Sequence, residues 1–229
     1  MSRLFTVILF LALSGSMLKA QNVGVSVSFF FPKGGEFSIP VSPLSYRGVA
    51  LPFSDYIGIQ TGGTLYRMGG QQISGLPFES NKPMFGNNLT AFVPLELYFK
   101  VGNKKSAFTM KAGVFGVYSF FTRLNYGNID RAIRVYEGWE VANADFTYKY
   151  LPGWGYQGGI ELLYYVKRNL GLTLEINYLY GGSNIDLAGS YTGGNAGVFQ
   201  TVQLDPASYQ KGKVEFTGLE ISLGAIFGN

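Results

Sequence analysis

The 229-residue sequence contains neither cysteine nor histidine. Without cysteine it can form no disulfide, thiolate metal site, cysteine nucleophile or lipoprotein acylation site. Without histidine it lacks the usual general base near neutral pH and the commonest metal ligand of proteins. Charged residues are also scarce, at 14%, against roughly 25% in an ordinary soluble domain. Thiol redox chemistry is excluded, and we predict no catalytic residue, no metal site and no cofactor.

Beyond the N-terminus the sequence also lacks an apolar run of the roughly 18 residues that a membrane-spanning helix requires. Yet 47% of the residues are hydrophobic and 16% are aromatic, and there are 32 glycines. This apolar content must therefore be spread over short segments, which favours β-strands.

Residues 1–20 have the pattern of a secretory signal peptide, with Arg3 in the charged region, an apolar stretch from Leu4 to Leu13, and Ala20 before the cleavage point. We predict that cleavage leaves one domain, residues 21–229. Loss of Arg3 and Lys19 would leave 16 of the 18 basic residues against 14 acidic ones, a net charge of +2. That charge is too small to indicate a nucleic-acid partner.

Three segments, 22–31, 89–101 and 170–181, alternate strictly between apolar and polar or small residues. In 89–101, for example, Leu95, Leu97 and Phe99 share a face opposite Glu96 and Tyr98. Such a period of two indicates strands with one apolar face.

Short polar connections alternate along the chain with long glycine-rich ones. The short ones lie at 53–55, 102–106 and 167–169, and the long ones at about 32–43, 69–88, 122–147 and 182–213. Transmembrane barrels have this arrangement, with short periplasmic turns and long outer loops. The sequence predicts a closed antiparallel transmembrane β-barrel of eight strands, at 22–31, 44–52, 56–68, 89–101, 107–120, 150–166, 170–181 and 214–227.

In this pattern the mature chain resembles the small eight-stranded outer-membrane barrels of Gram-negative bacteria with the OmpA-type architecture. Its last strand, with Leu219, Ile221, Leu223 and Phe227 on one face, is similar to the C-terminal signal read by the barrel-assembly machinery. The resemblance implies that this machinery inserts the protein into the outer membrane. It departs from the usual signal because Gly228 and Asn229 follow the aromatic residue.

A soluble secreted barrel is the alternative architecture, since periodicity alone does not distinguish the two. The face opposite the apolar one is small and polar, as a narrow barrel interior requires; its glycines include Gly155, Gly159, Gly171 and Gly224. Aromatic residues near strand ends, such as Trp154 and Tyr180, suit the interfacial girdles of a membrane barrel. Both features favour the membrane.

The predicted inward faces carry an unusual number of charges for buried positions. They form a predicted interior network of Glu96, Lys100, Lys111, Glu161, Glu175 and Glu220. A symmetric turn at 167–169 would place Glu161 opposite Glu175, with Lys111 on the next strand between them and also near Glu96. One interpretation is a carboxylate pair for acid–base work or cation binding. The other, which we favour, is a salt-bridged plug, because eight strands leave little free interior.

A second group of charges falls near the predicted outer ends of strands. This predicted basic rim comprises Arg47, Arg67, Arg123, Lys149 and Lys213. Cations there could pair with lipopolysaccharide phosphates. Alternatively, they only mark strand ends and keep the loops solvated.

The segment 124–146 mixes charged and aromatic residues, which suits a protein-contact surface as well as an ordinary polar loop. These residues are Tyr126, Arg131, Arg134, Tyr136, Glu137, Trp139 and Glu140.

Three functions remain open from the sequence. The favoured one is a non-enzymatic barrel in contact with outer-membrane lipid, whose long loops bind a ligand, lipopolysaccharide, or an envelope or extracellular protein. A lipid or peptide hydrolase would have to work without a histidine base. A diffusion pore is disfavoured by the small strand number.

Overall fold

The computed structural model describes residues 23–34, 39–205, 207, 209 and 211–227. The predicted signal peptide, residues 1–20, lies outside the described residues. The chain forms one antiparallel sheet and one helix. The strands are β1 (Val23–Pro32), β2 (Val41–Pro52), β3 (Ile57–Met68), β4 (Asn88–Gly102), β5 (Ser106–Phe120), β6 (Val141–Tyr150), β7 (Gly153–Lys167), β8 (Leu170–Asn195), β9 (Val198–Leu204), β10 (Gly212–Glu215) and β11 (Gly218–Phe227), and the helix is α2 (Tyr126–Glu137).

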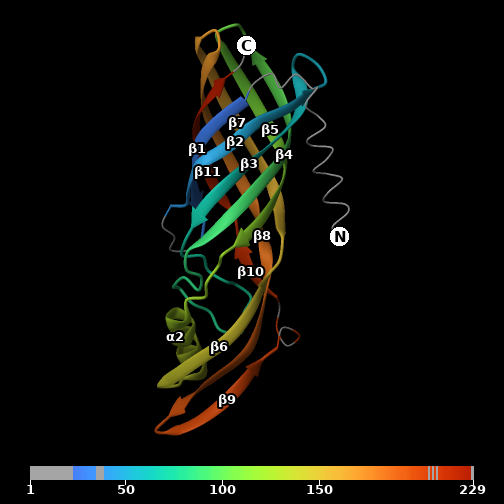
Figure 1. The fold of residues 1–229 in the computed structure, drawn as a ribbon. Helices are drawn as coiled ribbons and strands as arrows, with labels where there is room; N and C mark the ends of the chain where they lie inside the picture. Colours follow the sequence, from blue (N-terminus) through green and yellow to red (C-terminus); the bar gives the residue numbers. More distant parts are fainter. Residues whose placement is uncertain (1–22, 35–38, 206, 208, 210, 228–229) are drawn as a thin grey trace.

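Eight of the strands close into a barrel, in the order β1-β2-β3-β4-β5-β7-β8-β11. The ladder between β1 and β11, from Val23 opposite Phe227 to Pro32 opposite Gly218, closes the sheet. The predicted eight-stranded antiparallel barrel is therefore confirmed. Short turns and both described chain ends gather at one end of the barrel, and the long connections gather at the other (Figure 1). We call these the short-turn end and the long-loop end.

The barrel presents its apolar side chains outward. On β4, Val93, Leu95 and Leu97 are more than half exposed, whereas Thr90 and Glu96 on the opposite face are buried. The same alternation runs along β5, β8 and β11. Lipid requires this arrangement, because a closed sheet pairs its backbone groups between strands and its apolar side chains contact the hydrocarbon.

Four sequence-based strand limits were wrong, one of which is the start of β2, at Val41 and not at residue 44. The predicted strand 150–166 is divided by Leu151 and Pro152, so that Tyr150 ends β6 and Gly153 begins β7. The predicted strand 214–227 is likewise divided between β10 and β11. β8 continues 14 residues past Gly181, to Asn195, because its outer half pairs with β6, β9 and β10.

β6, β8 and β9 thereby form a three-stranded sheet that extends the barrel wall beyond its long-loop end, with α2 packed against β6 (Figure 1). We call α2, β6, β9 and residues 183–195 of β8 the extension. Its buried side chains, including Ile129, Ile133, Ile185 and Leu187, belong to the same hydrophobic core as Phe30 and Phe115 inside the barrel. Barrel and extension are thus continuous through one core.

Candidate functional site

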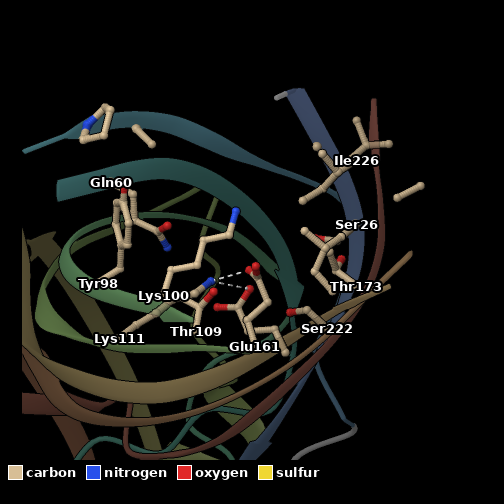
Figure 2. Close-up of a pocket in the computed structure, with 17 residues that line it drawn as sticks. Ser26, Gln60, Tyr98, Lys100, Thr109, Lys111, Glu161, Thr173, Ser222 and Ile226 are labelled. Carbon is tan, nitrogen blue, oxygen red and sulfur yellow. Dashed lines mark hydrogen bonds and ion pairs between the residues drawn. The ribbon is translucent and has the colours of Figure 1, made fainter. Parts of the chain in front are cut away.

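The interior of the barrel at its short-turn end holds a cavity of about 130 Å³ with both polar and apolar lining residues. Its walls include Gln60, Tyr98, Lys100, Lys111, Glu161 and Glu175, contributed by five different strands (Figure 2). A single water molecule needs roughly 10–15 Å³ of such space, so the cavity has room for several waters. This volume suits a hydrated vestibule, not a path for a large solute.

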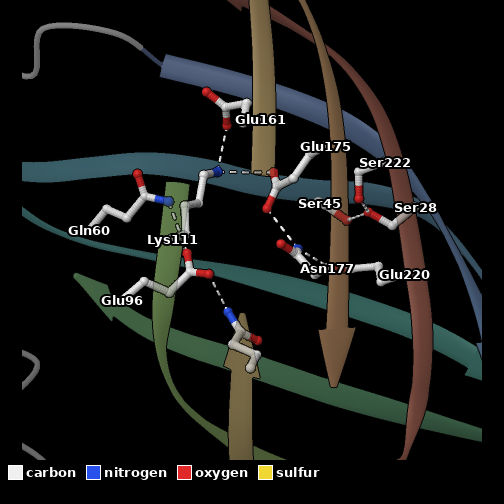
Figure 3. Close-up of polar contacts among 11 residues, drawn as sticks. Ser28, Ser45, Gln60, Glu96, Lys111, Glu161, Glu175, Asn177, Glu220 and Ser222 are labelled. Atoms are coloured by element: carbon white, nitrogen blue, oxygen red, sulfur yellow. Dashed lines mark hydrogen bonds and ion pairs between the residues drawn. The ribbon is translucent and has the colours of Figure 1, made fainter. Parts of the chain in front are cut away.

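The cavity is bounded on its inner side by an ion-paired cluster. Glu161 on β7 lies directly opposite Glu175 on β8. The Nζ atom of Lys111, from β5, lies 2.5 Å from Oε2 of Glu161 and 3.2 Å from Oε2 of Glu175 (Figure 3). The Lys111 side chain is 1% exposed and that of Glu175 is 3% exposed. One ammonium group thus separates two carboxylates that would otherwise repel each other in a dry environment.

A further buried carboxylate is linked to this cluster through an amide. The Nδ2 atom of Asn177 donates to Oε1 of Glu175 at 2.7 Å and to Oε2 of Glu220 at 2.8 Å. The hydroxyl of Tyr66 donates to the other oxygen of Glu220. Four of the six predicted interior residues, Lys111, Glu161, Glu175 and Glu220, therefore belong to one connected chain across the lumen (Figure 3).

Glu96 and Lys100 occupy different positions. The side-chain amides of Gln60 and Gln157 donate to the two oxygens of Glu96, at 2.9 and 2.5 Å. In the ladder Lys111 lies opposite Tyr98 and Glu96 lies opposite Gly113. Lys100 is partly exposed on the cavity wall, nearer the short-turn end than Lys111 (Figure 2).

The long-loop half of the lumen is filled with aromatic and aliphatic side chains. The rings of Phe92 and Phe115 lie 4.6 Å apart between centroids, and Phe30 packs against Tyr66 at 6.2 Å. The void among them is about 10 Å³, less than one water molecule needs. The expectation of a small, polar inner face is therefore right for one half of the barrel and wrong for the other.

This aromatic layer was not predicted, although the sequence contains a signal for it. Phe30 follows Ser26 and Ser28 on the polar phase of its strand, and Phe92 is in phase with Thr90. A large ring on the polar phase indicates an inward position. The glycines of the inner face make room for it, because a Cβ atom on Gly155 would lie 2.5 Å from Cζ of Phe115.

Four of the five predicted rim cations, Arg67, Arg123, Lys149 and Lys213, are exposed at the long-loop end. Arg67 is the penultimate residue of β3 and Arg123 follows β5, while Lys149 and Lys213 lie on β6 and β10 just beyond the barrel.

Arg47 is a correction to the predicted rim. Its backbone pairs with Gly24 on β1 and Gly62 on β3, so it lies in the middle of β2. The strand was predicted to begin at residue 44, whereas it begins at Val41. Because these first residues of β2 were left out, Arg47 was predicted too close to the strand end. The side chain of Arg47 lies outside the described part of the chain.

The segment 124–146, expected to be a loop, contains α2 and the first part of β6. The N-cap Asn125 accepts a hydrogen bond from the backbone of Asn128, and Gly138 ends α2 in the left-handed conformation, with φ at 69°. Ile129, Ala132 and Ile133 form the buried stripe of α2. Both caps and the helical spacing of this stripe are readable in the sequence.

The interior of the extension is stabilised by partly buried polar contacts. The hydroxyl of Tyr191 on β8 donates to Oε1 of Glu137 at 2.6 Å. Burial, together with this carboxylate, raises the pKa of Tyr191 well above its ordinary value. Oδ1 of Asp130 accepts a hydrogen bond of 2.9 Å from the backbone of Ala144, which ties α2 to β6. Burial raises the pKa of Asp130, and the hydrogen bond from Ala144 and the charge of Arg134 partly offset it.

Several large apolar residues near the tip of the extension are exposed. The exposed fractions are 79% for Val135, 77% for Val198 and 60% for Phe199. Among the predicted contact residues of this segment, Tyr136 is 55% exposed, whereas Trp139 is partly buried with its ring 5.8 Å from that of Tyr191.

Within the described residues, no helix is both long and apolar enough to cross a membrane. The same part of the chain contains no cluster of three or more acidic side chains arranged to hold a metal ion.

Comparison with known proteins supports the architecture. No protein-family model matches the sequence, and no curated protein matches it. Among solved structures, the chain is similar to the outer membrane protein OprG from Pseudomonas aeruginosa, with 15% identity, 91% of this chain and 96% of that chain covered, and a TM-score of 0.54. It also matches the outer membrane protein W of E. coli (14% identity, 91% and 97% covered, TM-score 0.38) and Ail of Yersinia pestis (12%, 90% and 94%, TM-score 0.36).

Of these three likenesses, the one to OprG exceeds a TM-score of 0.5, and it supports the fold. Together with the closed sheet and the apolar outer wall, it defines the class of protein. The chain has the fold of the small eight-stranded outer-membrane β-barrels, and this fold with its apolar outer wall supports the predicted location in the outer membrane of a Gram-negative bacterium. In barrels of this architecture the short turns face the periplasm and the long loops face outward.

Proposed function

We propose that this protein is a non-enzymatic binding scaffold of the outer membrane, whose extension contacts a protein partner. The observation that carries the proposal is the single hydrophobic core that runs from the barrel into the extension. A unit anchored in this way is held rigidly outside the membrane, and a rigid surface binds with less loss of conformational entropy than a free loop.

The interior supports the same conclusion. Its carboxylates are engaged with lysine, amide or phenol groups, and an aromatic layer separates them from the outside. The chain has no histidine to act as a base. These features disfavour a hydrolase, which needs accessible catalytic groups, and a pore, which needs a free path through the lumen.

A trimmed barrel tests this proposal. Residues 123–150 and 184–213 are each replaced by a short Gly-Ser linker, which leaves all barrel strands. Faster migration of unheated than of boiled protein on SDS gels shows that the trimmed barrel is closed. Wild-type and trimmed proteins in nanodiscs are then incubated with Gram-negative outer-membrane extract and culture supernatant. We expect proteins retained by the wild type to be lost from the trimmed barrel. Retention of the same proteins by both forms would refute the proposal.

A second candidate is contact with lipopolysaccharide, favoured by the four exposed cations at the long-loop end. Arg67, Arg123, Lys149 and Lys213 lie where the phosphates of the outer leaflet would meet the barrel. Replacement of all four by glutamine should reduce the lipopolysaccharide that co-purifies with the protein. The matched control replaces four exposed cations at the short-turn end, Lys104, Lys105, Lys167 and Arg168. Equal lipopolysaccharide content in the two variants would exclude this contact.

A further inference from the structure

β9 is an edge strand of the extension. It pairs with β8 along one side, from Gly189 opposite Leu204 to Asn195 opposite Val198, without a bulge. Among the described residues no strand pairs with its other side. β9 lies at the end of the extension that is farthest from the barrel (Figure 1). A free edge of this kind is a template for another strand.

The two edges of the extension sheet differ in how they are protected. At the β6 edge, α2 packs against the strand, and Asp145 and Lys149 add exposed charges. β9 has the sequence VFQTVQL, with no charged residue and no proline. Charges, proline, bulges and covering elements are the usual means by which proteins block edge pairing. β9 uses none of them, and its β-branched and aromatic residues favour strand pairing.

The chemistry of β9 also indicates its partner. Because β9 has no charged residue, it has no electrostatic attraction for a charged peptide. Two β9 strands can pair with each other without charge repulsion. If Thr201 of one copy lies opposite Thr201 of the other in an antiparallel ladder, Gln200 lies opposite Val202 and Phe199 opposite Gln203. Threonine pairs directly across a ladder are favourable. Val198 and Phe199, 77% and 60% exposed, become partly covered by the added strand.

We infer that β9 is a homotypic docking edge, which pairs in antiparallel fashion with β9 of a second copy of this chain. The inference rests on the proposed function, because it names the partner of the extension. An antiparallel ladder is symmetric about a two-fold axis, whereas a parallel ladder is not, so two identical edges pair in the antiparallel sense. The product is a continuous six-stranded sheet formed by two extensions.

The direction of β9 determines how the two barrels are placed. β8 runs out from the barrel to the tip, and β9 returns toward the barrel (Figure 1). In an antiparallel pair the two β9 strands point in opposite directions, and so do the two barrels. The two copies therefore belong to two membranes that face each other, and the contact joins neighbouring cells.

Clustering of proteoliposomes tests the inference. Vesicles that carry the wild type should cluster, as measured by turbidity and dynamic light scattering. Thr201→Lys should abolish clustering, because it places two lysines opposite each other in the symmetric ladder. Thr201→Glu should do the same, and a mixture of T201K and T201E vesicles should cluster again. Asn143→Lys is the matched control, since Asn143 is exposed in the same cross-strand row but on β6. It should leave clustering unchanged.

The outcomes distinguish homotypic pairing of β9 from lipid binding and from contact with a different protein. Failure of wild-type vesicles to cluster, persistent clustering with T201K, or no recovery in the mixture would overturn homotypic pairing. Recruitment of labelled protein-free vesicles would also overturn it, since the tip would then be binding lipid. If T201K loses clustering but still retains the same proteins from extract as the wild type, the extension has a separate partner. If only the homotypic contact is refuted, the proposed function still holds. If the trimmed barrel retains the same proteins as the wild type, both the proposed function and the homotypic contact are refuted.

Discussion

Glu161 and Glu175 lie directly opposite each other in the ladder between β7 and β8, inside the barrel, with Nζ of Lys111 within 3.2 Å of both carboxylates. Two facing carboxylates destabilise a ladder when nothing lies between them. Lys111 therefore stabilises the closure of three adjacent strands, and the short-turn half of the lumen depends on it.

Lys111→Met should lower the free energy of unfolding by about 3–5 kcal/mol, the usual cost of leaving a buried charge without its partner. Thermal unfolding in detergent, followed by circular dichroism, measures the change. The triple variant Lys111→Met, Glu161→Gln and Glu175→Gln should recover most of the loss, because it removes the charges together. An unchanged midpoint for Lys111→Met would show that the cluster does not stabilise the fold.

Gly155→Ala should destabilise the barrel by about 1–3 kcal/mol, the range for overpacking of a close-packed interior. The new methyl group would meet Cζ of Phe115 at 2.5 Å and the backbone oxygen of Tyr180 at 2.4 Å. Phe115→Leu in the same chain should restore part of the loss by removing the first contact. If the double variant is no more stable than Gly155→Ala, the backbone contact dominates.

The aromatic layer should close the lumen to ions. In planar bilayers we expect no steady channel from the wild type. The double variant Phe92→Ala and Phe115→Ala removes the two rings that lie 4.6 Å apart, and it should produce measurable leak. Val114→Ala on the lipid-facing side of β5 serves as the control and should not leak. A steady wild-type channel would contradict the closed interior.

Two glycines of the extension should respond in opposite directions to alanine. Gly138 has a φ of 69°, with no atom within 4 Å of an added Cβ, so Gly138→Ala should cost about 1 kcal/mol from backbone strain alone. Gly127 lies in the first turn of α2, where an added Cβ would meet only Oδ1 of Asn125 at an ordinary contact distance of 3.8 Å, and Gly127→Ala should stabilise by about 0.5 kcal/mol. Amide exchange in α2 measures both effects. Equal protection in both variants would contradict the capping role of Gly138.

The stability of the extension should fall at high pH because of Tyr191. Its pKa is raised in the folded state by burial and by Glu137, whereas the unfolded chain ionises near the ordinary value of about 10. The stabilising contribution is therefore complete below about pH 10 and is lost as the pH rises toward the folded pKa. Tyr191→Phe should be less stable than the wild type at pH 8 but should lose less stability between pH 9 and 11. Near-ultraviolet circular dichroism across this range checks the slope, and identical slopes would exclude this role for Tyr191.

The barrel itself follows from local sequence pattern. A period of two with one apolar face needs only neighbouring residues to be recognised, and the alternation of short and long connections determines the number of strands. Both properties are local, which explains why the architecture and the opposition of Glu161 and Glu175 could be predicted. The turn of only two residues between β7 and β8 transmits register directly from one strand to the next.

The tertiary structure decided where strands continue or stop and what fills the lumen. β8 continues past Gly181 because β10 pairs with it from Gly182 onward and β6 pairs with it from Ile185 onward, and such pairing between distant segments leaves little trace in local composition. Arg47 lies in the middle of β2 and not near its end for the same reason, because the start of β2 is determined by pairing with β1 and β3. Phe30 packs against Tyr66 and Phe92 against Phe115, rings that come from other strands, so their packing depends on the pairing of the strands into a barrel. The sequence by itself determined a β-barrel with an apolar outer face; only long-range pairing produced the extension and the free edge of β9, where we place the function.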